Sequence, residues 1–505
     1  MRGLHIQLAA ILTPLAVAAS APGQSFHGED HLLTSPHAAE SRSFGESIDM
    51  DGDWLVVGSS DEHPDRRGEV FIYRRAEMPD LWTLHSTLVD DEPRGSEDDF
   101  GQAVAIDGDW LAVAASFLAA GDPEVVLFEY DHDLDEWIER QTLQEENYRA
   151  DRRFGEDLAL SEEWLIVGAP DTNGTGVMHF YRRDEVDDEW VLYSQFEAAP
   201  GQVEFGQQVA IVGDRAIASA MGEAQYAPGF VRCFRFRPHE DRWVRIQELS
   251  PPGAGFRFGS SIDLSDETLV AGDSVEEKAY VFHFDPTWSA GRWELKAVIE
   301  PPGGEPMHTF GRAVAIDGNR RLVVTASHFD ARETNAGAAF VYRRDRSGDW
   351  RFIAPVLSSE PAEDMLFGRE VKIADGMLVM SSERLRSGGE QKVLSFALDH
   401  LRARFDITPI PMRSNEAATL EMSGLAPNEP VALFASTSLS GSVYLESLGV
   451  RLNLASANLL GVKRADERGF VRSTFRVPAA WAGTRWRFQA AQSGVNTNVL
   501  DLAIL

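Results

Sequence analysis

The stretch FGQAVAIDGDWLAVAA at residues 100–115 has a close copy, FGRAVAIDGNRRLVVTA, at residues 310–326. Both open with Phe-Gly, and every Phe-Gly dipeptide of the chain belongs to one series, which begins at Phe44, Phe100, Phe154, Phe205, Phe258, Phe310 and Phe367. The spacings are 56, 54, 51, 53, 52 and 57 residues, whereas 28 Phe and 42 Gly in 505 residues predict about two such dipeptides by chance. A nearly fixed period indicates a repeat architecture.

The repeats also agree beyond the dipeptide. After Phe-Gly comes an alternating segment such as Val104-Ala105-Ile106, then a tight Asp107-Gly108 type of turn, and then a second apolar run such as Leu165-Ile166-Val167. A third apolar segment follows a variable loop, and in most units a fourth opens with Trp. Those residues are Trp82, Trp137, Trp190, Trp243, Trp293 and Trp350. Four short strands in each of seven units predict an all-β chain with a seven-bladed β-propeller.

The last repeat unit lacks a Trp segment after its third strand (residues 393–397). A substitute lies before the first Phe-Gly, at His31-Leu32-Leu33-Thr34, at the offset where other units place their fourth strand. Pairing this segment with the last unit would join first to last and cover an exposed edge. Phe405-Asp406-Ile407 is the competing candidate.

With these motifs the chain resembles FG-GAP repeat proteins, the propeller type of integrin α chains and of many exported bacterial proteins. The resemblance covers roughly residues 30–400 and rests on the Phe-Gly pairs and on second-strand ends such as Val167-Gly168-Ala169-Pro170. It implies the propeller fold, but no particular activity, because propellers host binding, scaffolding and catalysis alike.

Two further regions flank the repeats. The N-terminus has one Arg, an apolar run from Leu8 to Ala19 and small residues, which predict a Sec-type bacterial signal peptide over residues 1–23. The propeller is expected at 24–405. From residue 406 the period stops, and alternating segments separated by turns predict a small C-terminal β-sandwich module at 406–505.

Charge and hydropathy limit the possible partners and locations. Asp and Glu number 80 against 47 Lys and Arg, a net charge of −33, which disfavours binding to nucleic-acid phosphates. The apolar run near the N-terminus is shorter than the roughly 20 residues that span a membrane, so no transmembrane segment is expected. Cys233 is the single cysteine, which excludes an intramolecular disulfide. The expected location is therefore secreted or associated with the cell envelope.

Topology indicates which end of the propeller could bind a partner. In a four-stranded meander the loops from strand 2 to 3 and from strand 4 to the next unit emerge on one face, and here they are the longer, variable ones. We call this end the loop face. Its candidate ligand-binding residues are Asp61, His63, Asp65, Asp90, Asp91, Asp98, Asp99, His308, His328, Asp330 and Glu333. Solvated acidic loops are the alternative interpretation.

No cofactor is expected. Integrin-type propellers hold calcium in a loop between the first two strands, but here that connection is a tight turn, too short to curl several oxygen ligands around one ion. The weak calcium candidates are Asp49, Asp51, Asp53, Asp171 and Asn173. The run His27-Gly28-Glu29-Asp30-His31 is a weaker metal candidate still, since it overlaps the proposed closing strand.

The linear motifs of serine hydrolases, zinc proteases, P-loops and dinucleotide-binding folds are absent from the sequence. The favoured hypothesis is a non-enzymatic binding or adhesion platform for a protein or polysaccharide at the cell surface. An extracellular hydrolase or lyase is the alternative, because propeller enzymes assemble their sites from loops. A structural envelope component is a third possibility.

Overall fold

The structure is a computed structural model of the chain. The residues it describes are 31–36, 43–60, 68–76, 82–89, 99–115, 123–145, 152–171, 175–184, 186–199, 204–220, 228–253, 255, 257–288, 290–302, 307–318, 320–330, 333–345, 347–358, 362–382, 391–398, 404–408, 417–423, 430–437, 443–445, 450–452, 458–464, 471–492, 495–496 and 500–503. The predicted signal peptide lies outside them. No helix in this described part is long and apolar enough to cross a membrane.

The first four Phe-Gly units each form one four-stranded antiparallel sheet, which we call blades 1 to 4. Blade 1 comprises β2 (Ser47–Asp51), β3 (Trp54–Ser59), β4 (Glu69–Arg75) and β5 (Trp82–Val89), and blade 2 comprises β6 (Phe100–Asp107), β7 (Trp110–Ala115), β8 (Glu124–Asp131) and β9 (Glu136–Gln144). Blade 3 comprises β10 (Leu158–Ser161), β11 (Trp164–Ala169), β12 (Val177–Asp184) and β13 (Glu189–Glu197), and blade 4 comprises β14 (Val209–Val212), β15 (Arg215–Ala220), β16 (Phe230–Arg237) and β17 (Arg242–Leu249).

Three more four-stranded sheets complete the repeats that the structure describes. Blade 5 comprises β18 (Ser261–Leu264), β19 (Thr268–Asp273), β20 (Lys278–Asp285) and β21 (Arg292–Ile299), and blade 6 comprises β22 (Phe310–Asp317), β23 (Arg321–Ala326), β24 (Ala338–Arg344) and β25 (Trp350–Val356). Blade 7 comprises β26 (Val371–Ala374), β27 (Met377–Ser381), β28 (Lys392–Ala397) and β1 (His31–Thr34). This arrangement is consistent with a β-propeller.

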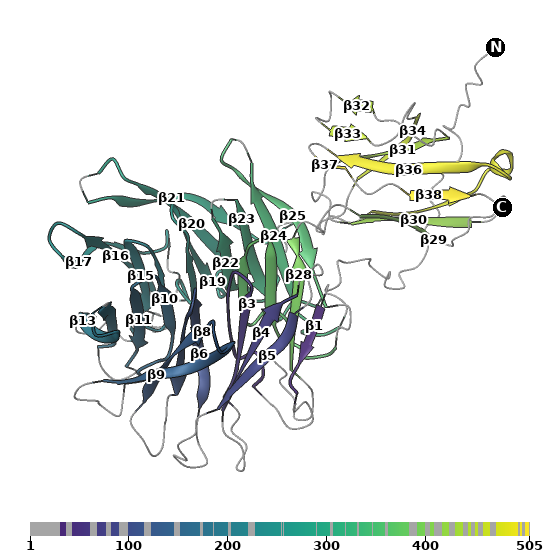
Figure 1. The fold of residues 1–505 in the computed structure, drawn as a ribbon. Coiled ribbons are helices and arrows are strands. Elements are labelled where there is room, and N and C mark those ends of the chain that lie inside the picture. Colours follow the sequence, from purple (N-terminus) through teal and green to yellow (C-terminus); the bar gives the residue numbers. More distant parts are fainter. Residues whose placement is uncertain are drawn as a thin grey trace.

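The hydrophobic core is divided among the spaces between blades. Each propeller cluster of buried residues combines side chains of two consecutive blades, and one of them joins Val393 of blade 7 to Phe44 and Leu55 of blade 1. Figure 1 shows the green β28 beside the purple β1. The packing therefore runs from blade to blade and returns to its start.

The Phe-Gly pairs have a structural role between the blades. Every Phe of the series is 0 or 1% exposed, and every Gly has φ between 83° and 91°. A Cβ at Gly101 would lie 2.9 Å from the carbonyl oxygen of Glu69 in the preceding blade, so the side chain of any other residue would clash there. The dipeptide thus fills the inter-blade core and lets two backbones approach closely.

The N-terminal segment, rather than residues 405–407, completes the last sheet. β1 pairs antiparallel with β28, and His31 lies opposite Ser395. Phe405–Ile407 instead belongs to β29 (Arg404–Thr408), which pairs with β30 (Ala417–Ser423). The chosen pairing buries Leu33 in the cluster between blades 7 and 1.

A side-chain latch joins the outer strands of neighbouring blades. The Gln141 amide accepts from the backbone N–H of Trp190 and donates to its carbonyl oxygen, at 2.7 and 2.9 Å, and Gln247 does the same to Trp293. His31 occupies the equivalent position of the closing strand, and its Nδ1 accepts from the N–H of Trp82 at 3.0 Å. The closing strand therefore makes the same kind of contact as a regular fourth strand.

The C-terminal strands form separate sheets around a core of their own. β29, β30 and β35 (Val471–Arg476) form one sheet. A second contains β34 (Asn458–Arg464), β31 (Pro430–Ser436), β36 (Arg485–Gln492), β37 (Val495–Asn496) and β38 (Leu500–Ala503), and β32 (Val443–Leu445) pairs with β33 (Val450–Leu452). Buried residues of both larger sheets, including Met422 and Phe488, share one cluster with Trp481 of the short 3₁₀ turn Ala479–Trp481.

We expect His31→Ala to lower the free energy of unfolding by about 1–2 kcal/mol, because the Trp82 N–H loses its acceptor. His31→Gln installs the residue of the other latches and should restore near-wild-type stability. Burial lowers the pKa of His31, so wild type should lose this stabilisation as the pH falls below about 6.5, while the Gln variant should not. Urea denaturation at pH 5 and 8 measures this, and equal midpoints for the Ala and Gln variants would contradict it.

Candidate functional site

The structure describes five of the eleven predicted loop-face residues. Asp61, His63, Asp65, Asp90, Asp91 and Asp98 lie outside the described residues. Asp99 immediately precedes β6 in blade 2, whereas His308, His328, Asp330 and Glu333 flank the strands of blade 6. The described candidates therefore concentrate at one blade.

His328 stands at the centre of a small polar group. Its Nδ1 lies 3.2 Å from Ser327 Oγ and 3.3 Å from Thr309 Oγ1, and its backbone N–H donates to Thr309 Oγ1 at 3.2 Å. Thr309 belongs to the connection that enters blade 6, and His328 follows the second strand of the same blade. Hydrogen bonds thus tie the two kinds of loop that make up the loop face.

A second group links blade 6 to blade 7. Asp330 accepts the backbone N–H of Asn335 at 2.8 Å, and the Asn335 amide donates to Asp364 at 2.9 Å. The backbones of the two loops are also joined, because the Asp364 N–H donates to the Thr334 carbonyl oxygen at 2.9 Å. The loop after β23 is therefore fixed against the connection that enters blade 7.

Backbone geometry is unusual in these same loops. Five residues other than Gly have positive φ there, from 36° to 65°: His308, Thr309, Asn335, Asp364 and Leu366. A left-handed conformation is rare for a β-branched residue such as Thr, and it persists only where surrounding contacts impose it. The loops of blades 6 and 7 are therefore held in one shape, with the side chains of His308, Asp330 and Glu333 exposed.

Among the described residues, this loop group combines a buried hydroxyl with a partly exposed imidazole. Ser327 is 3% exposed and is the sequence neighbour of His328. Within the described residues no carboxylate is placed against the His328 ring to orient it as a general base, as a nucleophile–base–acid arrangement requires. The exposed groups offer hydrogen-bond donors and acceptors to a ligand.

A cavity of about 530 Å³ lies along the axis of the blades. The first strand of every described blade contributes to its wall, and we call this cavity the channel. At one repeat position of the wall, blades 1, 5 and 7 have Asp49, Asp263 and Lys372, whereas blades 3 and 4 have Ala159 and Ala210. Sequence reasoning had not singled out this channel.

Channel side chains also connect the blades. The first strand is an edge of each sheet, so its outward N–H groups lack a partner within the sheet. Side chains of the preceding blade accept from N–H groups of this strand and of the turn after it, at 2.6–3.0 Å. Each acceptor stands one position earlier in its repeat than its donor does in the next repeat. The pairs are Asp49 with Ile106, Asp51 with Gly108, Asp107 with Glu162, Asp157 with Val209, Ser261 with Val314 and Asp263 with Ile316.

Lys372 replaces such an acceptor in blade 7. Its Nζ lies 3.1 Å from Asp49 Oδ1. Burial alone would lower the pKa of Lys372, but the carboxylates of Asp49, Asp263 and Asp157 raise it above its ordinary value. Burial raises the pKa of Asp157 to about 7 and also raises the pKa of Asp263. The channel thus holds two carboxyl groups with raised pKa values, Asp157 and Asp263, near one ammonium group.

The calcium candidates do not form a group. Asp49 and Asp51 accept the inter-blade hydrogen bonds described above. Asp53 is exposed in the turn after β2. Asp171 follows β11, and its backbone forms an isolated β-bridge with Arg152. Asn173 is outside the described residues. Within the described part, no three His, Cys, Asp or Glu side chains are arranged to hold a metal ion.

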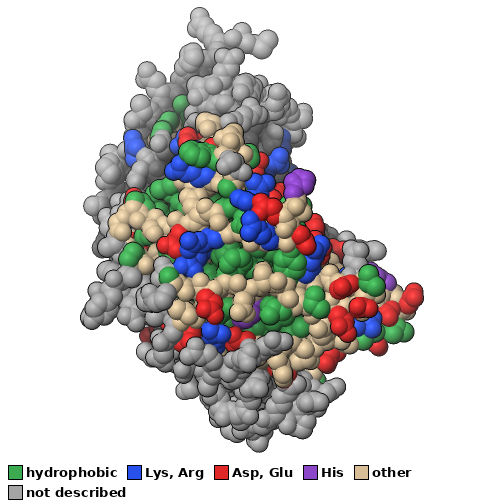
Figure 2. Space-filling model, turned by 90° about the vertical axis from the view of Figure 1, so that its left-hand side faces the viewer, with side chains coloured by type: hydrophobic (Ala, Val, Ile, Leu, Met, Phe, Trp, Pro, Cys, Tyr) green, Lys and Arg blue, Asp and Glu red, His purple; other side chains and the backbone are tan. Residues whose placement is uncertain are grey.

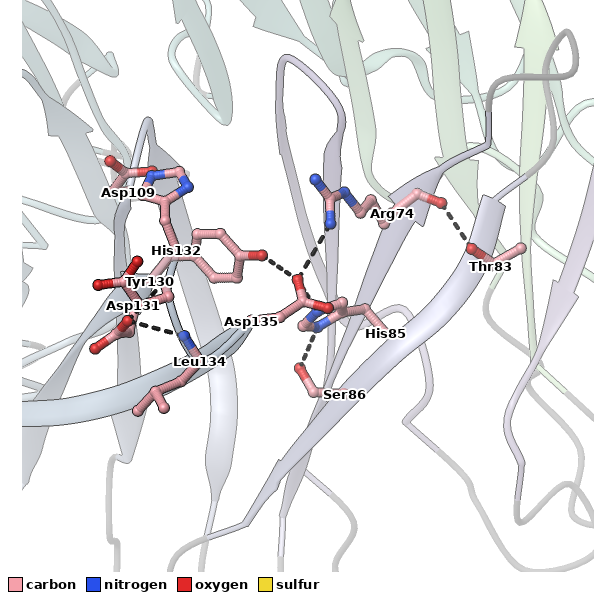
Figure 3. Close-up of polar contacts among 11 residues, drawn as sticks. Arg74, Thr83, His85, Ser86, Asp109, Tyr130, Asp131, His132, Leu134 and Asp135 are labelled. Atoms are coloured by element: carbon pink, nitrogen blue, oxygen red, sulfur yellow. Dashed lines mark hydrogen bonds and ion pairs between the residues drawn. The ribbon is translucent and has the colours of Figure 1, made fainter.

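A polar cluster on the hairpin end, opposite the loop face, is structural. Figure 3 shows Asp135 facing Tyr130, Arg74 and His85, and Asp135 Oδ1 accepts from the Tyr130 hydroxyl and, at 3.2 Å, from Arg74. The same positions of blades 3 and 4 hold Arg182, Tyr193 and Asp241 in similar contacts. Because equivalent residues make these contacts in two pairs of neighbouring blades, the cluster holds blades together.

Blade 3 contains a buried ionic group that sequence reasoning missed. Arg152 donates to Glu145 Oε1 at 2.7 Å, and His179 Nε2 lies 3.6 Å from the same oxygen. His179 is 2% and Glu145 8% exposed. Burial and the Arg152 guanidinium lower the pKa of His179 to about 4. His179 lies within the alternating segment 177–181, where only a comparison with the other repeats could have marked it as unusual.

Comparisons with known proteins place the chain as follows. The FG-GAP repeat family matches residues 293–342, and no curated protein sequence matches the chain. Two solved structures are similar in fold, those of proteins provisionally described as 6-phosphogluconolactonases from Bacteroides fragilis and Bacteroides uniformis. Each is 14% identical to this chain with a TM-score of 0.43. Each match covers 63% of this chain, and it covers 85% of the Bacteroides fragilis chain and 86% of the Bacteroides uniformis chain. Saccharomyces cerevisiae Sqt1 shares 10% identity and a TM-score of 0.41 over 90% of this chain and 100% of its own. Such distant likenesses carry no information on activity.

We expect Asp157→Asn to change the pH dependence of stability. Because the folded state raises the pKa of Asp157 to about 7, it binds more protons than the unfolded chain, so wild type should lose stability as the pH rises from about 4 to 7. Asn retains an acceptor for the Val209 N–H but does not titrate.

The Asn variant should match wild type at pH 4 and exceed it at pH 8 by on the order of 2 kcal/mol, a value reduced because Asp157 is partly exposed and solvent screens its charge. Denaturation midpoints across this pH range provide the measurement. Parallel pH profiles for the two proteins would show that Asp157 titrates normally.

Proposed function

We propose that this chain, a β-propeller that contains an FG-GAP repeat, is a non-enzymatic binding platform that recognises a protein or glycan partner outside the cytoplasm through its loop face. The arrangement of the loops of blades 6 and 7 carries this proposal. Their backbones adopt costly left-handed conformations and are hydrogen-bonded to one another, while His308, Asp330 and Glu333 point to solvent. A fixed surface of this kind reduces the entropy lost on binding.

The proposal includes a closed ring of seven blades with a C-terminal β-sandwich. Seven inter-blade clusters among the described residues, with the last joining blade 7 to blade 1, support closure. A ring without open ends is a rigid base for loops. The two C-terminal sheets, which share a core, would attach the platform to a surface.

The second candidate function is an extracellular hydrolase or lyase, and one observation favours it. Asp157 lies in the channel with a pKa raised to about 7, near Lys372, and a carboxyl group that is protonated near neutral pH can serve as a general acid. Turnover of a panel of polysaccharides and esters, abolished by Asp157→Asn, would support this function instead.

The binding function is tested by saturable retention of the full chain on washed envelopes and purified polysaccharides of the cell that produces it. The loop variant combines His308→Ala, Asp330→Asn and Glu333→Gln. The matched control combines His132→Ala, Asp133→Asn and Glu136→Gln on the hairpin end, with the same change of charge at exposed positions. We expect the loop variant to lose at least tenfold in affinity, about 1.4 kcal/mol, and the control to bind as wild type.

Two results would count against the proposal. If wild type shows no saturable retention, the chain is not a platform for these partners. If both variants lose affinity equally, binding depends on overall charge rather than on the loops of blades 6 and 7.

A further inference from the structure

The outer strand of blade 7 differs from the outer strands of the other blades. β1 pairs with β28 over four residues, whereas the fourth strands of blades 1 to 6 each pair with their third strand over six to eight. Each of those six pairings contains a register shift, while β1 and β28 pair in continuous register. β1 is therefore attached over a shorter length and without the bulge that twists a regular outer strand.

β1 also contributes little to the core. Leu33 is its one buried side chain, in the cluster between blades 7 and 1, and Leu32 is half-buried against the cluster between blades 6 and 7. In blades 1 to 5 the outer strand carries a Trp that is 1–7% exposed, and a Trp buries a much larger apolar area than a Leu. A strand with little buried apolar surface is held weakly and opens locally before the rest of its domain.

Side-chain bonds hold some of the regular outer strands to their sheets as well. Arg140 of β9 donates to Glu129 of β8 at 3.0 Å, and Arg232 of β16 donates to Glu248 of β17 at 3.0 Å. Figure 2, which faces the side where β13 and β17 lie, shows basic side chains interspersed with acidic ones over this part of the molecule. β1 has the sequence HLLT, which contains no Asp, Glu, Lys or Arg for such a pair.

Blade 7 contacts blade 1 through residues that do not belong to β1. The Trp82 indole N–H donates to Ser395 Oγ of β28 at 3.1 Å. At the other junctions the indole nitrogen of the corresponding Trp has no hydrogen-bond partner among the described residues. Lys372 Nζ lies 3.1 Å from Asp49 Oδ1, again between blades 7 and 1. This junction therefore has contacts of its own that persist when β1 leaves.

We propose that β1 is a releasable strap, which detaches from β28 while the other three strands of blade 7 stay paired and packed against blade 1. β28 keeps its pairing with β27 over five residues, and Leu394 and Phe396 stay in the cluster between blades 6 and 7. Release uncovers the outer edge of β28. An uncovered strand edge is a template for pairing with an extended segment, so the strap controls whether blade 7 offers one.

Native-state hydrogen exchange of the full chain, measured by mass spectrometry of its peptides, tests the proposal. We expect the peptide that contains β28 to exchange faster, by about tenfold or more, than the peptide that contains β8, the third strand of blade 2. Peptides that contain β27 of blade 7 and β4 of blade 1 should exchange as slowly as β8, because these strands stay paired on both sides.

Two matched variants distinguish the strap from a regular outer strand. His31→Ala removes the hydrogen bond to the Trp82 N–H and should raise the exchange rate of β28 by about a further fivefold. Gln141→Ala removes the equivalent bonds to Trp190. It should leave the exchange of β8 unchanged, because β9 is still held by eight residue pairs.

A disulfide can fix the strap in place. Thr34 lies opposite Lys392, whose backbone N–H and C=O bond to Ser382, so the Thr34–Lys392 pair is not hydrogen-bonded and its Cβ atoms are close. In the variant that combines Thr34→Cys with Lys392→Cys, oxidation should slow the exchange of β28 by about tenfold or more. The same variant in its reduced form is the control, and the buried Cys233 is left unchanged.

Three results would overturn the proposal. The first is exchange of β28 as slow as that of β8 in wild type. The second is exchange of β27 and β4 as fast as that of β28, which would mean that the whole junction opens. The third is unchanged exchange of β28 after the disulfide has formed. If the disulfide does not form, equal effects of His31→Ala on β28 and of Gln141→Ala on β8 would overturn it instead.

Discussion

Every blade of this protein has two apolar faces, and each must be covered by a neighbouring blade. That constraint explains why the core is divided into inter-blade clusters, and why the chain has to return its N-terminal segment to the last sheet. An open array would leave the outer faces of its first and last blades exposed to water, at a cost proportional to the apolar area. The buried Phe of each Phe-Gly pair contributes to these clusters, and its Gly allows the close backbone approach that they need.

The same arrangement determines the chemistry of the channel. Packing face to face brings the first strands together at the axis, where each presents N–H groups that its own sheet does not use. A buried N–H without a partner costs free energy, so acceptors such as Asp49, Asp157 and Ser261 bond across the gap. The acidic channel is thus primarily a structural feature, and most of its carboxylates have a role before any ligand is considered. Lys372 is different, because it bonds to a side chain and satisfies no N–H of blade 1.

Much of the fold could be predicted from the sequence. The strands of each unit and the closing segment follow from the Phe-Gly register and from alternation, which are local signals. The blade 6 candidates were named because the predicted topology places their loops on one face. The hydrogen bonds of His328 to Thr309 and of Asp330 to Asn335 depend on positive φ values at Thr309 and Asn335, which the sequence does not reveal. The channel bonds were missed because each joins residues 52–57 positions apart. His179 and Arg232 were missed because each lies inside an otherwise apolar strand, where a single polar residue resembles normal alternation.

A repeat protein supplies its own reference for such residues. When the blades are compared at one position, a departure from the common residue type has to be explained by its neighbours, because the backbone around it is the same. The latch at Asp135 has an equivalent at Asp241 and so belongs to the fold. Arg232 has no cationic counterpart in the other blades, and an apolar side chain suffices at that position in most of them. The guanidinium of Arg232 is satisfied within the fold by Glu248, by the Glu197 carbonyl oxygen and by the rings of Phe205 and Phe230, so its neighbours explain it without a ligand.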